Sequence, residues 1–439
     1  MPDTPTAQAL ELVIEEQEFL SVMQDECTAF CALVGALSAR SDSIWHKKHF
    51  FQLLVRFESL ESLLDDYGAR FNRTYSYLRE LTASVRSFAG AGYSLSHLSS
   101  RLRNYGLLES LELSTYSGFE GSISNVRTFI QGSVVAMLED LTQEMGDLGL
   151  EVTKTQYPEQ DFALPAVRQR LPHNVDEEEP GDERQKVAEV ASKFLLAADM
   201  LAERRFRPIQ DAEERHRFLG SFCSEEQARV YEATVHNLQS AYDTYIKNTS
   251  LESRDPHLGQ LRGMASAVLH MLEAVTALTH FYERHESDVR SEAAQVRLQR
   301  LVDRSWVQER TLNRLLVTAL EVMESGRSLA QGLLQRYTNA QELVVTLSGD
   351  LVLHARPAAL IVGIVSRYGT PVELVVRGQS CNAGSILELL VTVGSHPDEK
   401  TFTFRGDENP LRDIALLFQY GLGEEGLDGL PSELSYLVQ

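Results

Sequence analysis

Apolar residues recur in steps of three and four along most of the first 340 positions, the spacing of one face of an α-helix. After a polar break at residues 38–43, a second long helix is expected, and its pattern extends toward Phe88. Each stripe needs another apolar surface, so the pattern predicts a helical bundle. The first stripe contains Leu20, Met23, Cys27, Phe30, Val34 and Leu37, and the second contains Phe50, Leu54, Phe57, Leu64 and Tyr67.

Small residues divide this first block of helices. The run Ala89-Gly90-Ala91-Gly92 predicts a break, and shorter helices are expected around Leu95 to Leu113. Ser117-Gly118 and Gly121 predict a turn before another helix from Val126 to Leu148. Residues 1–155 are therefore expected to form an antiparallel bundle.

Residues 156–182 interrupt the helical pattern. They hold Pro158, Pro165, Pro172 and Pro180 and the acidic run of residues 176–179. This composition predicts an exposed linker. The acidic run fits a solvated spacer better than a docking site for a basic partner.

A second helical block is expected over residues 183–340. Ser224 and Gln227 have the spacing of a capping box that opens one of its helices. The last helix is predicted to be the longest, and its regular steps suit packing within a bundle or across a homodimer. The two helical blocks could form two separate units or one elongated bundle, and the sequence does not decide between these arrangements. Neither block resembles a known family. The stripes contain Val187, Val190, Phe194, Ala197 and Leu201, then Met264, Val268, Met271, Val275, Leu278 and Tyr282, and finally Leu312, Leu316, Ala319, Met323, Gly326, Ala330, Leu333 and Tyr337.

The pattern changes at about residue 341, where short strands alternate with helices. Strands are expected at residues 344–347, 371–377 and 401–405, and helices after Pro357, after Ser385 and at Asn409-Pro410, with Asn409 as the N-cap. Residues 341–426 are predicted to be a small α+β domain, followed by a tail over residues 427–439.

His354 lies where the first strand of this domain leads into a helix, in the sequence Leu353-His354-Ala355-Arg356-Pro357-Ala358. Unpaired backbone N–H groups and the positive end of the helix dipole make such a position suitable for phosphate. A neutral imidazole can accept a phosphoryl group, and the Arg356 guanidinium could hold its oxygens. The alternative is a capping histidine followed by a surface arginine.

Two further signatures accompany the histidine motif: Asn382-Ala383-x-Ser385-Ile386, and Gly406-Asp407-Glu408 before the last helix. With these three signatures in order, residues 342–425 resemble the HPr phosphocarrier family of the bacterial phosphotransferase system. The resemblance implies an open-faced β-sandwich, a four-stranded antiparallel sheet under three helices. The whole chain is then multidomain, an all-α bundle region followed by this α+β domain.

The resemblance also implies roles for individual residues. His354 would accept a phosphoryl group from enzyme I at the expense of phosphoenolpyruvate, and Arg356 would stabilise it. An enzyme II component or a regulatory protein would receive it. Ser385 occupies the position of regulatory phosphorylation in some members, and the partner contacts map to Ala355, Pro357, Ile386 and Leu387.

Several positions depart from the family pattern. Val352, Gly384 and Glu388 replace a common glycine, a frequent lysine and another common glycine, and the first helix has little basic character beyond Arg367. Ser385 and Glu388 also have the spacing of a capping box, which gives the serine a structural role. An added phosphate there would be repelled by Glu388.

The 439 residues carry a net charge of -22, of which residues 341–439 contribute -7 (13 acidic and 6 basic residues). This acidity argues against a nucleic-acid partner. No apolar run is long enough to cross a bilayer and no signal peptide is apparent, so a cytoplasmic protein without membrane insertion is expected. The four cysteines fit that compartment, and Cys27 and Cys31, one helical turn apart, are expected to be buried apolar groups.

The helical region shows no enzyme signature, and no cofactor or metal is expected. His46 and His49 enclose two lysines, and Glu213-x-x-His216 matches half of a di-iron motif without a second copy. His270, His280 and His285 are expected at surfaces or interfaces.

Three hypotheses follow for the whole chain. The first is a covalent phosphoryl carrier or regulator, rather than a turnover enzyme, in which the helical region senses or relays the state of His354. The second is an HPr-like scaffold that has lost phosphotransfer. In the third, the helical region is an enzyme or ligand-binding module, which a deep polar pocket would indicate.

Overall fold

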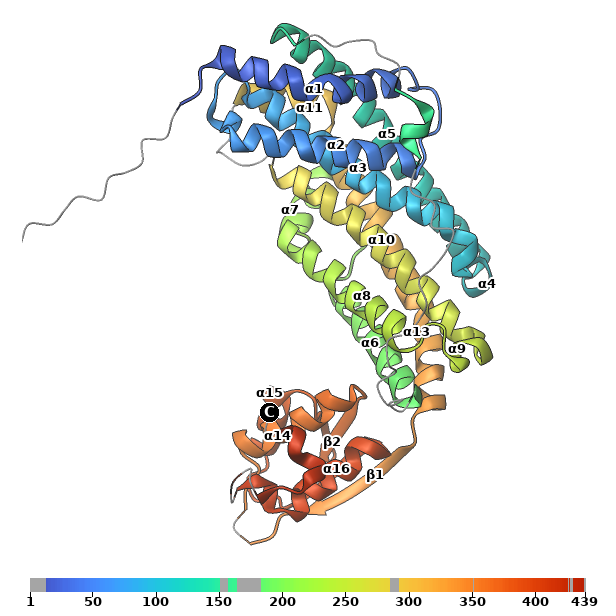
Figure 1. Cartoon of the computed structure of the whole chain (residues 1–439). Coiled ribbons are helices and arrows are strands. Elements are labelled where there is room, and N and C mark those ends of the chain that lie inside the picture. The colour runs from blue at the N-terminus through green and yellow to red at the C-terminus, as the bar shows by residue number, and fades with distance from the viewer. Residues whose placement is uncertain are drawn as a thin grey trace, which may run out of the picture.

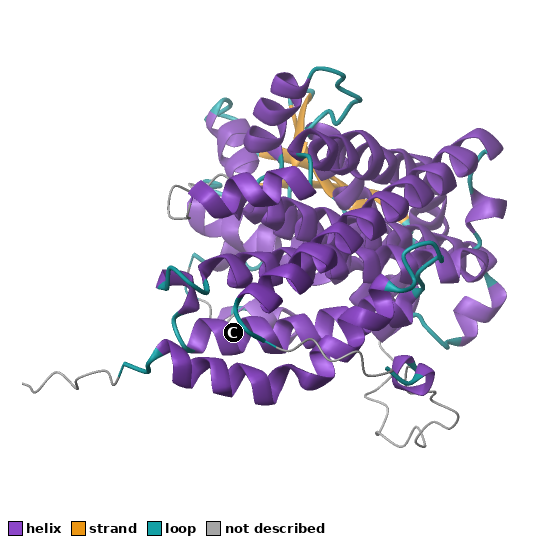
Figure 2. Ribbon diagram, turned by 90° about the horizontal axis from the view of Figure 1, so that it is seen from above, coloured by secondary structure: helices purple, strands orange, loops and turns teal. Residues whose placement is uncertain are grey.

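The structure is a computed structural model, and it describes residues 13–150, 157–163, 183–284, 292–349, 351–424, 426 and 429–437. Long helices make up most of it, and a four-stranded sheet lies near the C-terminus (Figures 1 and 2). The predicted order, a helical region followed by a small α+β domain, is confirmed.

The first block is built from four long helices and three short helical segments. Its elements are α1 (Glu16–Ser38), α2 (Lys47–Asp66), η1 (Ala69–Phe71), α3 (Ser76–Arg101), η2 (Leu102–Tyr105), α4 (Leu107–Ser110) and α5 (Leu113–Asp147). The second long helix ends at Asp66, well before Phe88, because Gly68 adopts a left-handed conformation (φ 70°).

Two predicted breaks in this block are absent. Helix α3 runs straight through residues 89–92, where Ala89, Ala91 and Gly92 are buried and the Phe50 ring packs onto Gly92. Small residues here permit close helix packing. Helix α5 likewise continues through residues 117–121, because its buried stripe keeps the helical period across the expected turn: Phe119, Ile123, Val126 and Ile130.

The second block adds a layer of long helices alongside the first. Its elements are α6 (Glu183–Glu203), α7 (Ala212–Phe222), α8 (Glu225–Tyr245), α9 (Ser250–Arg254), α10 (Pro256–Arg284), α11 (Glu292–Leu301), α12 (Arg304–Glu309), the π-helical segment η4 (Arg310–Leu316) and α13 (Val317–Tyr337). The predicted capping box at Ser224 and Gln227 is present. The helix that was expected to be the longest, the last one, is divided by η4 into shorter parts. Helix α5, with 35 residues, is longer than either α12 or α13.

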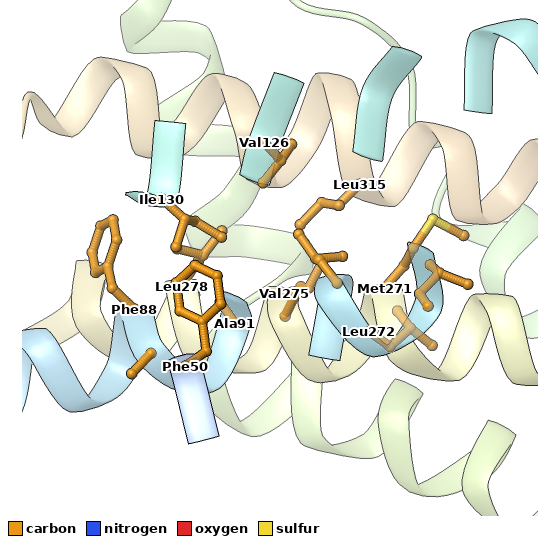
Figure 3. Packing of buried hydrophobic residues seen from close by; sticks show 14 of the residues in the cluster. Phe50, Phe88, Ala91, Val126, Ile130, Met271, Leu272, Val275, Leu278 and Leu315 are labelled. Carbon is orange, nitrogen blue, oxygen red and sulfur yellow. The ribbon is translucent and has the colours of Figure 1, made fainter. Parts of the chain in front are cut away.

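One hydrophobic core joins the two helical blocks. Helix α10 packs against α3 of the first block as well as α8 and α13 of the second. Figure 3 shows Phe50, Phe88, Val126, Val275 and Leu278 converging in this core. The helical region is therefore one elongated bundle rather than two independent units.

Part of the predicted linker is docked on this bundle. The short helix η3 (Glu159–Phe162) places the Glu159 carboxylate 2.5 Å from both Arg40 and Lys48. The Phe162 ring is buried against His49. The acidic run of residues 176–179 lies outside the described residues.

The C-terminal domain is an antiparallel sheet with helices, as the resemblance implied. Its elements are β1 (Ala340–Thr346), α14 (Ala355–Tyr368), β2 (Val372–Val376), β3 (Gln379–Asn382), α15 (Ile386–Gly394), β4 (Thr401–Asp407), α16 (Glu408–Gln419), η5 (Gly421–Gly423) and η7 (Ser432–Leu437). The strand order is β1-β4-β2-β3, with Leu343 and Leu374 both paired to Phe404. The last helix begins two residues earlier than expected, with Asp407 instead of Asn409 as its N-cap.

Residues 427–439 were expected to form a tail, but η7 within this range packs onto the domain. Leu434 is fully buried, and the Tyr436 hydroxyl donates to Asp413 at 2.7 Å. Residues 432–437 thus complete the domain core.

The domain contacts the helical region through the first turns of α6. The Gln185 side chain donates to the Tyr368 carbonyl at 2.8 Å and accepts from Asn409 at 3.2 Å. The Glu189 side chain lies against Gly369. These contacts involve the C-terminal end of α14, which is remote from His354, and the first turn of α16.

The approach of α10 to η2 depends on Gly263. A Cβ atom there would overlap the Tyr105 carbonyl oxygen, which belongs to rigid backbone. We predict that Gly263→Ala lowers the free energy of unfolding by about 1–3 kcal/mol through overpacking. Gly259→Ala, on the same helix in open space, should be neutral or stabilise by up to about 1 kcal/mol. Urea denaturation of both variants measures this, and equal effects would contradict the proposed contact.

His49 should make the bundle sensitive to acid. Burial, together with Lys48 and Arg40, lowers the pKa of His49 from 6.5 to about 4, so the unfolded chain binds its proton first. Stability is therefore present above pH 6.5 and is lost as the pH falls to about 4, by up to about 3 kcal/mol. The non-titrating variant His49→Asn should show a smaller loss in urea midpoints measured at pH 7 and pH 4.5. An unchanged loss would rule His49 out.

Candidate functional site

The loop between β1 and α14 fixes His354 at the start of the helix. His354 has an extended backbone and is the N-cap, and its carbonyl accepts from the Ala358 N–H at 3.0 Å. Leu353 before it and Pro357 after it are buried. Lys400 secures the loop by donating to the Leu351 carbonyl at 2.8 Å. Apolar anchors on both sides therefore hold a polar residue at the surface.

The His354 ring has a different neighbour at each nitrogen. Nδ1 accepts from the Arg356 backbone N–H at 3.4 Å, and Nε2 lies 3.0 Å from the Glu424 carboxylate. The side chain is 51% exposed. Because Nδ1 accepts a hydrogen bond, a neutral ring carries its proton on Nε2, the nitrogen beside the Glu424 carboxylate. The Nδ1 lone pair then faces the beginning of α14.

Glu424 was not identified from the sequence, and a turn after α16 places it. Gly421, Leu422 and Gly423 are all left-handed (φ 64°, 59° and 68°), and Leu422 is fully buried. A strained non-glycine conformation held by core packing carries the chain back toward α14. The Gly-Leu-Gly run signals a turn, but no local pattern reveals which helix it approaches.

The Arg356 guanidinium is available to an anion. The residue is exposed, and its guanidinium makes no hydrogen bond or ion pair with any residue that the structure describes. No contact with a described residue therefore has to be broken before it meets phosphate oxygens.

Ser385 caps α15 as predicted, but the capping box is incomplete. Its hydroxyl accepts from the Glu388 N–H at 3.4 Å. The Glu388 carboxylate reaches past Ser385 to the Asn382 N–H, at 3.0 Å, because the Asn382 carbonyl already accepts the Ser385 N–H. Glu388 thus ties β3 to the start of α15. The regulatory role of Ser385 stays a prediction.

An apolar surface lies on α15. Ile386, Leu387 and Val391, here called the α15 patch, are 43%, 70% and 57% exposed in the whole chain. Of the other two residues expected to contact partners, Ala355 is exposed and Pro357 is buried. Pro357 can shape the start of α14 but offers little surface to a partner.

The histidines of the helical region have structural neighbours. The His46 N–H donates to His49 Nδ1 at 3.0 Å, His270 pairs with Glu273 and His280 with Glu225. His285 lies outside the described residues. Within the described ranges no three His, Cys, Asp or Glu residues gather as a metal site, and no helix is long and apolar enough to span a membrane. Cys27 and Cys31 are buried, as expected, and neither forms a disulfide.

The sheet, its helices and an exposed histidine capping α14 together define an HPr-like domain. The family model for the PTS HPr component phosphorylation site matches residues 341–411, and no family matches the N-terminal region. No match was found among curated proteins or among solved structures. The domain thus indicates a phosphocarrier role in the phosphotransferase system, whose HPr proteins work with partners such as enzyme I and enzyme II.

The capping role of Ser385 can be measured directly. We predict that Ser385→Ala lowers the stability of α15 by about 1 kcal/mol, because the Glu388 N–H loses its acceptor. Ser385→Asn, which retains an acceptor, should stay near the wild type. Hydrogen exchange of the α15 amides in the full chain measures both. Equal protection in Ser385→Ala and the wild type would contradict the capping role.

Proposed function

We propose that Nδ1 of His354 accepts a phosphoryl group from a phosphoenolpyruvate-dependent enzyme I and passes it to an enzyme II component or a regulatory protein. The observation that carries this proposal is that the two ring nitrogens have different surroundings. Nε2 faces the Glu424 carboxylate, and Nδ1 faces the start of α14. We also propose that the reaction takes place in the cytoplasm, and a homodimer through the helical region stays a prediction.

The transfer follows from this geometry. The Nδ1 lone pair forms a bond to phosphorus while the bond between phosphorus and the donor breaks. Nε2 keeps its proton, and the positive charge that develops on the imidazole is stabilised by Glu424. The Arg356 N–H, released from Nδ1, and the Arg356 guanidinium can then donate to the phosphoryl oxygens.

The site is open to a partner in the full chain. The α15 patch and Ala355 remain exposed with the helical region present. The contacts of the domain with α6 lie at Tyr368, Gly369 and Asn409. Helix α14 has 14 residues, so these contacts are about 20 Å from His354. The contacts with α6 therefore leave His354 itself accessible to a partner.

Phosphorylation of His354 would also act as a signal to the attached helical region. Phosphorylation adds about two negative charges to His354 at neutral pH. The new charges would lie beside Glu424 and oppose it electrostatically, which favours a rearrangement of the turn after α16. Because α16 also contacts Gln185 through Asn409, the helical region is positioned to respond to the state of His354.

A labelling assay tests the carrier role. The full chain is incubated with enzyme I from the source organism and radiolabelled phosphoenolpyruvate, and we expect acid-labile, base-stable label. His354→Ala should abolish it, whereas His396→Ala, at the other histidine of the domain, should not. Arg356→Ala should slow labelling by about 100-fold through the lost stabilisation of charge. Glu424→Gln should also slow it, because the negative charge that stabilises the developing imidazolium is lost.

The alternative is a phosphotransfer-inactive scaffold with the same fold. Val352, where the family commonly has glycine, is 51% exposed beside the site and could obstruct a donor. Absence of label on a folded wild-type chain would favour the scaffold. In that case Val352→Gly should restore labelling if the valine is the obstruction.

A further inference from the structure

A cavity of about 340 Å³ lies in the helical region between α7, α10 and α12. This volume is within the range of pockets that hold small organic molecules, about 300–1,000 Å³. Figure 1 shows α7 beside α10, well away from the HPr-like domain. The cavity is thus separate from the His354 site.

The elements around the cavity are held firmly in place. Asn313 exchanges two hydrogen bonds of 2.9 Å with the backbone of Ile209, which joins the loop before α7 to η4. The Arg215 guanidinium donates to the carbonyls of Ile209 and Gln210. The cavity is therefore preformed, which lowers the cost of binding.

A chain of hydrogen bonds crosses one wall. The Gln308 amide donates to the Tyr282 hydroxyl at 2.5 Å, and the same hydroxyl is 2.6 Å from His216 Nδ1. These hydrogen bonds orient the Gln308 amide. Its oxygen is left as an acceptor without a described partner, although the residue is only 6% exposed. Burying an unpaired acceptor is costly, so a ligand that donates to it would be bound favourably.

Thr311 presents a second buried polar atom in the same wall. Helical threonines nearby donate to the carbonyl four residues earlier, as Thr276 and Thr279 do. Thr311 lies in the π-helical segment η4, and its hydroxyl has no described partner at 3% exposure. π-Helical turns are frequent at functional sites.

The charge of the lining is negative. Glu283 is half-buried, and one of its oxygens accepts from the Glu225 N–H at 2.7 Å. Arg304 stacks on the Tyr282 ring, 5.0 Å from its centre, but is not among the residues that line the cavity. Leu219 and Val307 supply apolar surface. Burial raises the pKa of the Cys223 thiol to about 12, so this thiol is neutral and no nucleophile.

We propose that this cavity binds a small primary amine with an apolar body, whose ammonium group donates to the Gln308 amide oxygen and the Glu283 carboxylate. The apolar body lies against Leu219 and Val307. The proposal does not involve His354, and its failure would leave the phosphocarrier assay unaffected.

Three probes of one shape and different charge test the proposal on the full chain: cyclohexylmethylamine, cyclohexylmethanol and cyclohexanecarboxylate. Calorimetric titration should show the amine binding in the millimolar range or tighter, at least about tenfold more tightly than the alcohol, with no saturation by the carboxylate. Glu283→Gln, which retains an acceptor for the Glu225 N–H, should remove most of the preference for the amine over the alcohol.

A blocking variant locates the site. Gly220 lies at the edge of the cavity with open space around it, so Gly220→Phe should fold and occlude the cavity. It should abolish amine binding, whereas the control Gly121→Phe, also a helical glycine in open space, should bind as the wild type does. The proposal is overturned if no probe saturates the wild type, if the amine has no advantage, or if Gly220→Phe binds it normally.

Discussion

The architecture depends on the burial of α10 on every side. Six consecutive residues of this helix, from Met264 to Leu269, are buried, so no single neighbour could cover them. Helix α3 covers one side, and α8 and α13 cover the others. Because α3 comes from the first block, the two blocks share one core, and each depends on the other for stability. The close approach at Gly263 shows how tightly the two are fitted.

The same bundle determines where the HPr-like domain lies. The helical run from Arg304 to Tyr337 begins beside the cavity and ends three residues before β1. From Thr311 to Tyr337 it spans about 40 Å. Helix α6 packs along α13 and uses Gln185 to contact the domain at Tyr368 and Asn409. The domain is therefore held at two points, a covalent one through β1 and a hydrogen-bonded one through α6.

Local patterns predicted what depends on local physics, and packing between distant segments decided the rest. The position of His354 at a helix start followed from Pro357 and the apolar period after it. Its partner Glu424 did not, because a buried Leu422 in a left-handed turn brings it there. A glycine at position 92 could end a helix or allow close packing of two helices. The structure shows close packing, because the Phe50 ring from α2 lies against Gly92. No local pattern predicts how the two helical blocks join, because that too depends on packing between distant segments.

Electrostatics constrain how a partner can recognise the domain. The chain carries a net charge of -22, and α14 has only two basic residues. One is Arg356 at the site, and the other, Arg367, stacks on the Tyr436 ring 4.6 Å from its centre. A partner with a strongly acidic surface would be repelled at long range. The α15 patch offers a surface of another kind, because exposed apolar side chains gain free energy when they are covered, whatever the net charge.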